Sequence, residues 1–494
     1  MSVDVTSIRQ EWITYRRPAR LIALAAAALS VLALGLLYAL GAQRGCPGTC
    51  PETPRAADGS YVTDQFWFLH RDLGPEGSVT ARLTSMTGTI TYPPPDHDEI
   101  VSGLVPWAKT GIVLKDGLTP GSRYAAVMMT GGNGVRFQHD YEHDVAGNAG
   151  GVSDGAPRWL RLTRSGDTVT GAESVDGEQW HTVGTATLDG LPDVVRIGLF
   201  ATSPGDLTVR GTTRQARFTQ AVGVFDNVSA EGTTGDWAAD PIGESNGTDW
   251  EKAHPSGAVR DGSTFRLAGF GDISPVSHDG AITPDDILTG LPFALLILVV
   301  AAARYGAGQA RTTGAATVVV GGAAFVTGLL AVGVTAPVSA AILGSKGFPV
   351  EVPPPLTVIR VLVGVAAVLG LCAAMAYLIG GRLRRGWAAV VVAIGVLVVP
   401  YAIAILTPLP GAEWLLRLTP AAGFAVKQTM VEYPQVTAVY EPWTGYFPLP
   451  WWAGFLVLCG WAAVIAWATS KPAHGRPGQG LGRDRGRDQV SQGQ

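Results

Sequence analysis

The stretch "TTGAATVVVGGAAFVTGLLAVGVTAPVSAAILG", residues 312–344, decides the class of this chain, because it contains no Asp, Glu, Lys or Arg. A helix needs about 20 mostly apolar residues to cross the hydrocarbon core of a bilayer, where every backbone polar group must be paired internally. Comparable runs occur before and after it, so we expect a polytopic α-helical membrane protein. Its six predicted spans are 21–42, 287–303, 312–344, 357–380, 387–410 and 449–470.

Composition agrees with this class and excludes another. The chain has 494 residues, of which 47% are hydrophobic and only 15% are charged, which is typical of a protein with bilayer segments. Its formal net charge is −4, and no basic run is interleaved with aromatic residues. We therefore expect no nucleic-acid partner.

The distribution of positive charge predicts the orientation, because Lys and Arg are enriched in cytoplasmic loops. Six spans with both termini cytoplasmic place every basic cluster inside, including Arg304 and Arg311 between the second and third spans. We therefore expect a multi-pass protein of the cell membrane with its large first loop outside. The other clusters are Arg9, Arg16, Arg17 and Arg20; Arg382, Arg384 and Arg385; and Lys471, Arg476, Arg483, Arg485 and Arg487.

The first apolar run, 21–42, has two interpretations. Basic residues precede it, as in a signal peptide, but it is longer than the 7–15 residues of a signal-peptide apolar region. We favour a retained anchor, because cleavage would leave five spans and break the charge pattern. Cys46 and Cys50 follow it in "CPGTC" and are predicted to form a small disulfide loop, the alternative being a reduced pair without a role.

The long loop between the first two spans predicts an all-β domain. In "RWLRLTRSGDTVTGAESVDGEQWHTVG", residues 158–184, apolar and polar side chains alternate and turn signals occur at "SGD" and "VDGEQ". Similar segments recur without a convincing helical period, which is typical of an antiparallel sandwich. We expect an extracytoplasmic β-sandwich over 57–232, a connector over 233–286, and a disordered basic cytoplasmic tail over 471–494.

Four ordered blocks carry a resemblance for this domain: "VPWAKTGIVLKDGLTPGSRYAAVMMTGGNGVRFQHD", "WLRLTRSGDTVTGAESVDGEQWHTVG", "VVRIGLFATS" and "VFDNVSA". They resemble the concanavalin-A-like lectin/glucanase sandwich, whose members often bind sugars on a concave sheet. The resemblance implies a glycan partner and makes Trp67, His139 and Tyr141 a candidate ligand face, because aromatic rings stack on sugars. The alternative for such aromatics is the sandwich core. No spacing of carboxylates predicts a glycosidase pair, so we expect no enzyme.

The membrane part carries a second resemblance. Residues 411–467, "GAEWLLRLTPAAGFAVKQTMVEYPQVTAVYEPWTGYFPLPWWAGFLVLCGWAAVIAW", resemble the end of a permease of the type 2 ABC exporter class, and "IRQEWITYRRPAR", "ARYGAGQARTTGAAT" and "AGFGDISP" agree with it. The resemblance implies a subunit that pairs with a second permease copy, as a homodimer or heterodimer, and with a separate ABC ATPase. The sequence contains no G-x-x-x-x-G-K-[ST] loop, so we expect no cofactor bound directly and ATP on the partner.

The same resemblance assigns two of the three groups of candidate residues. It implies a cytoplasmic amphipathic helix over 1–20 and an ATPase-coupling loop after the second span. The i,i+4 spacing of Glu413 and Arg417 predicts a short outer-face helix before the sixth span, the alternative being a simple outer loop. The coupling loop is shorter than in that family and has Ala303 where the family has an acidic residue. The candidates are Glu11, Trp12 and Arg16 in the first helix; Arg304, Tyr305, Arg311 and Thr312 in the loop; and Glu413, Trp414 and Arg417 in the outer helix.

The predicted function is therefore that of an ATP-driven exporter permease whose sandwich handles substrate or binds the envelope. The rival is a surface receptor or glycan-binding protein that does not transport. Ion-coupled transport is disfavoured, because it needs ionisable groups buried in the membrane and only Arg360 approaches that position, where we expect it to reach the interface.

Overall fold

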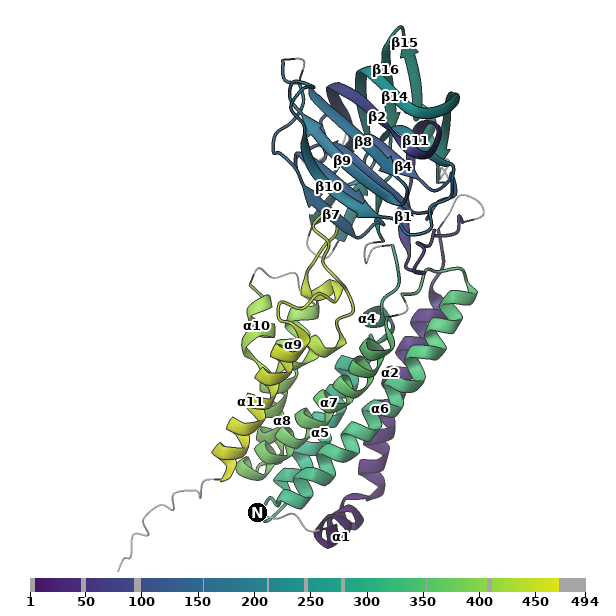
Figure 1. Cartoon of the computed structure of the whole chain (residues 1–494). Helices are drawn as coiled ribbons and strands as arrows, with labels where there is room; N and C mark the ends of the chain where they lie inside the picture. The colour runs from purple at the N-terminus through teal and green to yellow at the C-terminus, as the bar shows by residue number, and fades with distance from the viewer. Residues whose placement is uncertain are drawn as a thin grey trace, which may run out of the picture.

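The computed structural model describes residues 5–45, 50–92, 99–153, 155–210, 213–243, 248–276, 280–351, 353–406 and 411–470. A β domain stands on one end of an elongated helical bundle (Figure 1). The predicted tail, 471–494, lies outside the described residues, and so does Cys46. Cys50 is disulfide-bonded, whereas Cys372 and Cys459 are free.

The chain enters the bundle through two helices and returns to it after the β domain. The helices are α1 (Val5–Tyr15), α2 (Pro18–Gly41), α3 (Asp249–Ala253), α4 (Pro284–Ile287), α5 (Leu291–Ala307), α6 (Gly314–Ser345), α7 (Pro355–Leu383), α8 (Gly386–Leu397), α9 (Val399–Leu406), α10 (Glu413–Leu418) and α11 (Trp451–Ser470), with 3₁₀ turns η1 (Pro420–Lys427) and η2 (Pro442–Thr444). The N-terminal helix predicted over 1–20 is thus interrupted after Tyr15, and a second helix, α2, begins at Pro18. A proline disfavours helical backbone at the residue before it, which separates the two helices.

Within the described residues, α2, α6, α7 and α11 are long and apolar enough to span a membrane. The pair α8 and α9, bent by 43°, makes a fifth candidate. The second expected span, 287–303, corresponds to α5, which also has 17 residues but begins four residues later, because residues 284–287 form the separate helix α4 and Pro292 lies in the first turn of α5. The described residues therefore contain four or five helical segments of spanning length, and α5 is an additional, shorter apolar helix that packs between them.

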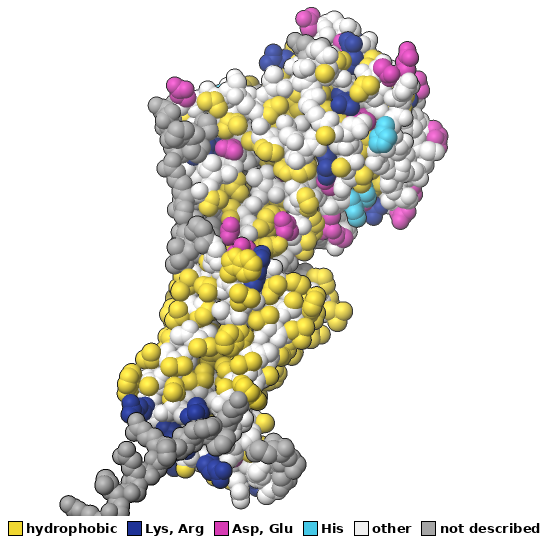
Figure 2. Space-filling model, turned by 90° about the vertical axis from the view of Figure 1, so that its left-hand side faces the viewer, with side chains coloured by type: hydrophobic (Ala, Val, Ile, Leu, Met, Phe, Trp, Pro, Cys, Tyr) yellow, Lys and Arg dark blue, Asp and Glu magenta, His cyan; other side chains and the backbone are white. Residues whose placement is uncertain are grey.

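Helix α5 lies at the centre of the bundle, packed against α2, α7 and α8. Close approach to α7 depends on small residues: a Cβ on Gly306 would lie 2.0 Å from the Tyr377 carbonyl oxygen, and one on Gly380 would lie 2.2 Å from that of Ala303. Around this core, large apolar side chains are exposed on α2, α6 and α11, and Figure 2 shows a broad hydrophobic surface over the bundle. These surfaces are compatible with membrane insertion.

The β domain is built on two very long strands that pair with each other, β2 (Phe66–Thr91) and β14 (Thr219–Ile242). On its other edge β2 pairs first with β11 (Val195–Thr202), from Trp67 to Leu73, and then with β8 (Arg158–Ser165), from Glu76 to Leu83. Gly74 and Pro75 separate the two partners, and Pro75 has no N–H to donate to a ladder. One continuous strand therefore serves both halves of a folded sheet, which encloses the main β core around residues such as Ile112, Phe137 and Leu162.

Thirteen of the described strands form this sheet, and most follow the order β10-β9-β8-β2-β11-β4-β5-β6-β7. The predicted hairpin region 158–184 supplies β8 and β9 and the beginning of β10. The remaining strands are β1 (Val62–Asp64), β3 (Ile100–Ser102), β4 (Lys109–Lys115), β5 (Tyr124–Thr130), β6 (Val135–His139), β7 (His143–Ala146), β9 (Thr168–Ser174), β10 (His181–Thr187), β12 (Asp206–Arg210), β13 (Thr213–Arg217), β15 (Gly257–Asp261), β16 (Thr264–Gly269) and β17 (Ile273–Pro275).

The predicted boundary at residue 232 cuts through this sheet, and the segment 233–286 is more than a connector. Strand β14 continues past it, β15 and β16 extend the sheet from β14, and β17 returns to pair with β1. The described domain therefore reaches Pro275. The block "AGFGDISP", residues 268–275, which resembles the approach to a permease span, belongs to the β domain, where it forms the end of β16 and β17.

Candidate functional site

At the end of the bundle away from the β domain, α1 packs across the connection between α5 and α6 (Figure 1). Thr313, the residue that caps α6, donates its hydroxyl to the Glu11 carboxylate at 3.0 Å. The rings of Tyr15 and Tyr305 meet edge to face at 5.3 Å. Two candidate segments far apart in the sequence are therefore joined.

The side chain of Tyr305 is buried within this contact. Its side chain is 6% exposed, the Arg20 guanidinium lies 3.9 Å from its ring centroid, and the Tyr377 ring of α7 lies 5.5 Å away on another side. It is therefore enclosed by α1, α2 and α7, which leaves little of its side chain accessible for contact with a partner protein. Thr312 is partly buried beside Gly381.

Four other candidates remain accessible there: Trp12, Arg16, Arg304 and Arg311. We call these four residues the distal surface. Figure 2 shows Lys and Arg side chains gathered at this end of the bundle. The distal surface thus combines one aromatic ring with three guanidinium groups on two segments that the Glu11 hydrogen bond holds together.

The predicted outer-face helix corresponds to α10, in the part of the bundle nearer the β domain (Figure 1). Arg417 donates to the Glu413 carboxylate at 3.0 Å, one helical turn away, and its guanidinium lies 4.8 Å from the Trp414 ring centroid. All three side chains are at least partly exposed. Helix α10 leads into η1, which packs against α7 and α11.

A buried ion pair that the sequence analysis did not predict joins η1 to α4, the first helix after the β domain. Lys427, at the end of η1, is 4% exposed and pairs with Asp285 of α4. The rings of Tyr401 and Phe447 flank its ammonium group at 5.5 and 5.3 Å. The only sequence signal was a single lysine in the apolar run "PAAGFAVK", and its partner lies more than a hundred residues away.

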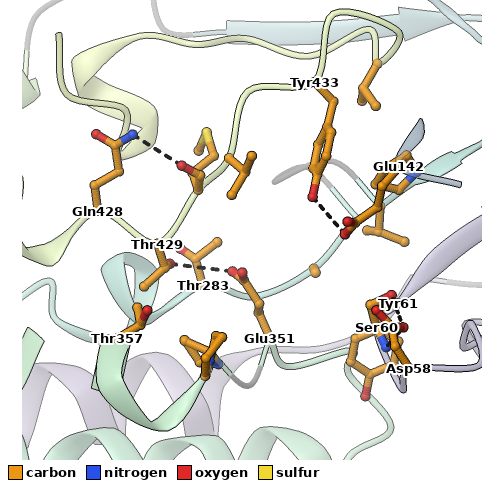
Figure 3. Close-up of a pocket in the computed structure, with 18 of the residues that line it drawn as sticks. Asp58, Ser60, Tyr61, Glu142, Thr283, Glu351, Thr357, Gln428, Thr429 and Tyr433 are labelled. Carbon is orange, nitrogen blue, oxygen red and sulfur yellow. Dashed lines mark hydrogen bonds between the residues drawn. The ribbon is translucent and has the colours of Figure 1, made fainter. Parts of the chain in front are cut away.

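Between the β domain and the bundle lies a pocket of about 800 Å³, here called the junction pocket. The segment before β1 and the β6–β7 turn supply its β-domain wall, and the α6–α7 connection, α7 and the chain after η1 supply the other (Figure 3). Its charged residues are Arg55, Asp58, Glu142, Glu351 and Arg360.

The β6–β7 turn connects the two walls. Glu142 accepts a hydrogen bond from the Tyr433 hydroxyl at 2.9 Å through its carboxylate, and another from the Gln435 side chain at 2.9 Å through its carbonyl oxygen. The two preceding residues, Asp140 and Tyr141, adopt left-handed backbone conformations with φ of 45° and 66°. Such strained turns persist only where surrounding contacts hold them, and they are enriched at functional sites.

Two further residues line the pocket. Arg360, which was expected to reach the membrane interface, donates there to the Gln428 carbonyl oxygen. Glu351, which was not a candidate, follows α6 and accepts from Thr429 at 3.5 Å (Figure 3). Burial, opposed by the Thr429 hydrogen bond, raises the pKa of Glu351 to about 7.

The candidate ligand face of the sandwich is not assembled in the structure. Tyr141 is 2% exposed, and its hydroxyl donates to Asp64 at 2.9 Å beside the Lys115 ammonium group. Trp67 is half-buried against the main β core. His139 lies on β6, which β11, β4 and β5 separate from β2, and its ring stacks on His143 at 4.3 Å. Tyr141 instead forms a buried hydrogen-bonded group with Asp64 and Lys115, next to the β6–β7 turn that carries Glu142.

No protein-family model and no curated protein matches this sequence. Among solved structures, a protein of unknown function from Saccharomyces cerevisiae is 16% identical, with a TM-score of 0.23, and the match covers 37% of this chain and 84% of that one. Scytalido-glutamic peptidase is 10% identical, with a TM-score of 0.27, over 43% of this chain and all of that one. The GH43 protein BlXynB from Bacillus licheniformis is 14% identical, with a TM-score of 0.18, over 26% and 24%. Similarity this low assigns no function.

Proposed function

We propose that this protein is the membrane-spanning permease subunit of an ATP-driven exporter of the type 2 ABC class. In this proposal the chain crosses the cell membrane six times, with both termini in the cytoplasm and the β domain outside. A separate ABC ATPase binds and hydrolyses ATP, and a second permease copy completes the pathway.

The distal surface is the observation that carries the proposal. The resemblance assigned the first helix and the loop after α5 to the cytoplasmic face independently, at residues 8–20 and 303–317. In the structure the Glu11–Thr313 hydrogen bond joins these segments, and Arg304 and Arg311 remain exposed beside them. Exposed guanidinium groups are suited to an acidic groove on an ATPase, where each charge-assisted hydrogen bond is worth about 1.5–3 kcal/mol.

Two further features support the arrangement in the membrane. Helix α5 has 17 residues, the lower limit for a span, and its position inside the bundle allows it to cross with little contact to lipid. Basic side chains gather at the end of the bundle opposite the β domain (Figure 2), as the positive-inside rule requires when that end is cytoplasmic.

The rival function, a surface receptor or glycan-binding protein, receives less support. It relied on Trp67, His139 and Tyr141 as a shared face, but Trp67 lies on β2, which three strands separate from β6, and Tyr141 is buried. We therefore retain the exporter as the proposal.

Affinity purification of the whole protein in mild detergent tests it. An ABC ATPase should copurify with the wild-type chain, and the double variant Arg304→Glu, Arg311→Glu should lose most of it, because both charges at the interface are reversed. Arg260→Glu is the matched control, because it reverses an exposed charge on β15, in the β domain. Equal recovery of the ATPase with all variants, or no ATPase with the wild type, would contradict the proposal.

A further inference from the structure

We propose that the junction pocket binds an organic cation, an amine or quaternary ammonium compound that also carries an aromatic or other apolar body. The pocket volume of about 800 Å³ is within the range of about 300–1,000 Å³ that is usual for sites of drug-sized ligands. This inference depends on the pocket itself and holds whether or not the chain exports.

The carboxylates of the pocket lack cationic partners among the described residues. Glu142 accepts from the Tyr433 hydroxyl, Glu351 from Thr429, and Asp58 from the backbone and hydroxyl of Ser60. All of these donors are neutral. Burial raises the pKa of the Tyr433 hydroxyl, and so do the negative charges of Glu142, Glu351 and Asp58. The three carboxylates therefore act on one common space.

Each of the two arginines of the pocket contacts its wall, although the Nε of Arg360 has no hydrogen-bond partner among the described residues. Arg55 donates to the Gly59 carbonyl oxygen at 3.0 Å, and its guanidinium lies 3.9 Å from the Tyr61 ring centroid. Arg360 donates to the Gln428 carbonyl oxygen and lies 5.8 Å from the Trp451 ring centroid. These contacts hold both guanidinium groups against the wall, whereas the carboxylates of Glu142 and Glu351 point toward the open space (Figure 3).

Aromatic side chains are the second feature of the pocket, after the carboxylates, that favours binding of an organic cation. The rings lining the pocket are Tyr61, Tyr433, Tyr440 and Trp451. Aromatic faces attract organic cations and provide apolar area for the rest of the ligand. Three unpaired carboxylates with aromatic walls therefore select a cation with an apolar body over an anion of the same size.

Glu351 makes this binding dependent on pH. Its pKa is about 7, so it is mostly neutral at pH 6 and mostly ionised at pH 8. A cation binds more tightly to the ionised form, so affinity rises with pH across this window. If ionisation strengthens binding about tenfold, the affinity at pH 8 should exceed that at pH 6 by about fivefold.

The experiment uses the full chain in nanodiscs of phosphatidylcholine, without ATP or any partner protein. Binding of radiolabelled tetraphenylphosphonium is measured against tetraphenylborate, an anion of nearly the same size and shape, and binding to protein-free discs is subtracted. We expect saturable binding of the phosphonium cation, at least tenfold weaker binding of the borate, and the fivefold increase between pH 6 and pH 8.

Two variants test the residues. Glu351→Gln should weaken phosphonium binding at pH 8 by about tenfold and abolish its pH dependence, and Glu142→Gln should weaken it while keeping that dependence. Glu178→Gln, an exposed carboxylate between β9 and β10, is the matched control and should bind like the wild type. Equal affinity for the two ions, or wild-type binding by both pocket variants, would overturn the assignment. A cooperative melt of each variant shows that it is folded.

Discussion

Shortening the β domain to its predicted boundary should destroy its stability, although the missing part was expected to be a connector. We compare two soluble fragments with the same start, 51–276 and 51–232. The longer one keeps the whole of β14 and strands β15, β16 and β17, whereas the shorter one loses every strand after Gly232.

The structure gives the size of this effect. Full burial of a large apolar side chain stabilises the folded state by about 1.5–3 kcal/mol. The short fragment lacks four buried apolar side chains, so its free energy of unfolding should fall by about 6–12 kcal/mol. Removing Asp272 also leaves the buried Lys109 ammonium group without its 2.6 Å partner, at about 3–5 kcal/mol. The total of about 9–17 kcal/mol is comparable to the roughly 5–15 kcal/mol by which most domains are stable. The buried side chains that are lost are Ile242, Phe265, Leu267 and Ile273.

Urea unfolding followed by circular dichroism measures the outcome. The fragment 51–276 should unfold in one cooperative transition, and 51–232 should show none or one at far lower urea. Introducing Lys109→Met into the short fragment removes the unpaired charge and should restore only a part of the loss. Equal midpoints and slopes for the two fragments would refute the reasoning that β15–β17 belong to the folding unit.

Three further expectations concern single side chains. Lys115→Met in the fragment 51–276 should lower the free energy of unfolding by about 3–5 kcal/mol, measured in urea, because Asp64 would remain buried without its cation. Glu351→Gln should raise the melting temperature of the full chain at pH 8 and change it little at pH 5: the folded pKa lies above the ordinary value, so ionisation opposes folding only above about pH 5, and a constant difference would contradict this. Arg417→Ala should change stability by no more than about 1 kcal/mol, because its pair with Glu413 is partly exposed, and a larger loss in a thermal melt would show that α10 contributes more than a surface ion pair.

The elements that were predicted correctly have strong local signals. The uncharged run 312–344 becomes α6, which begins at Gly314 and ends at Ser345, and the alternation at 158–184 becomes paired strands of one sheet. The expectation of six spans is not confirmed: four or five helical segments of the described residues reach spanning length, and α5, which has 17 residues like the second predicted span, begins at Leu291 and not at residue 287. A difference of a few residues at a proline is below what apolar composition alone can locate.

Candidate residues were harder to judge, because residue type does not reveal which side of a sheet or helix is covered. Tyr141 has the composition of a sugar-binding aromatic, yet its hydroxyl is buried against Asp64. Tyr305 was expected to meet a partner and is enclosed by Tyr15, Arg20 and Tyr377. Arg304 and Arg311, one residue and six residues away from it, remain exposed.

The sequence by itself determined the class of the protein: apolar runs that must be helical in a bilayer, and a polar, alternating insertion that must be a sheet. Both follow from local periodicity and from the requirement that every backbone group be paired. Only the tertiary structure decided where the β domain ends, since β17 pairs with β1 across about two hundred residues. It alone also brought Glu142, Glu351 and Tyr433 to one pocket and Asp285 to Lys427, because such contacts depend on how separate elements pack and leave no regular spacing in the chain.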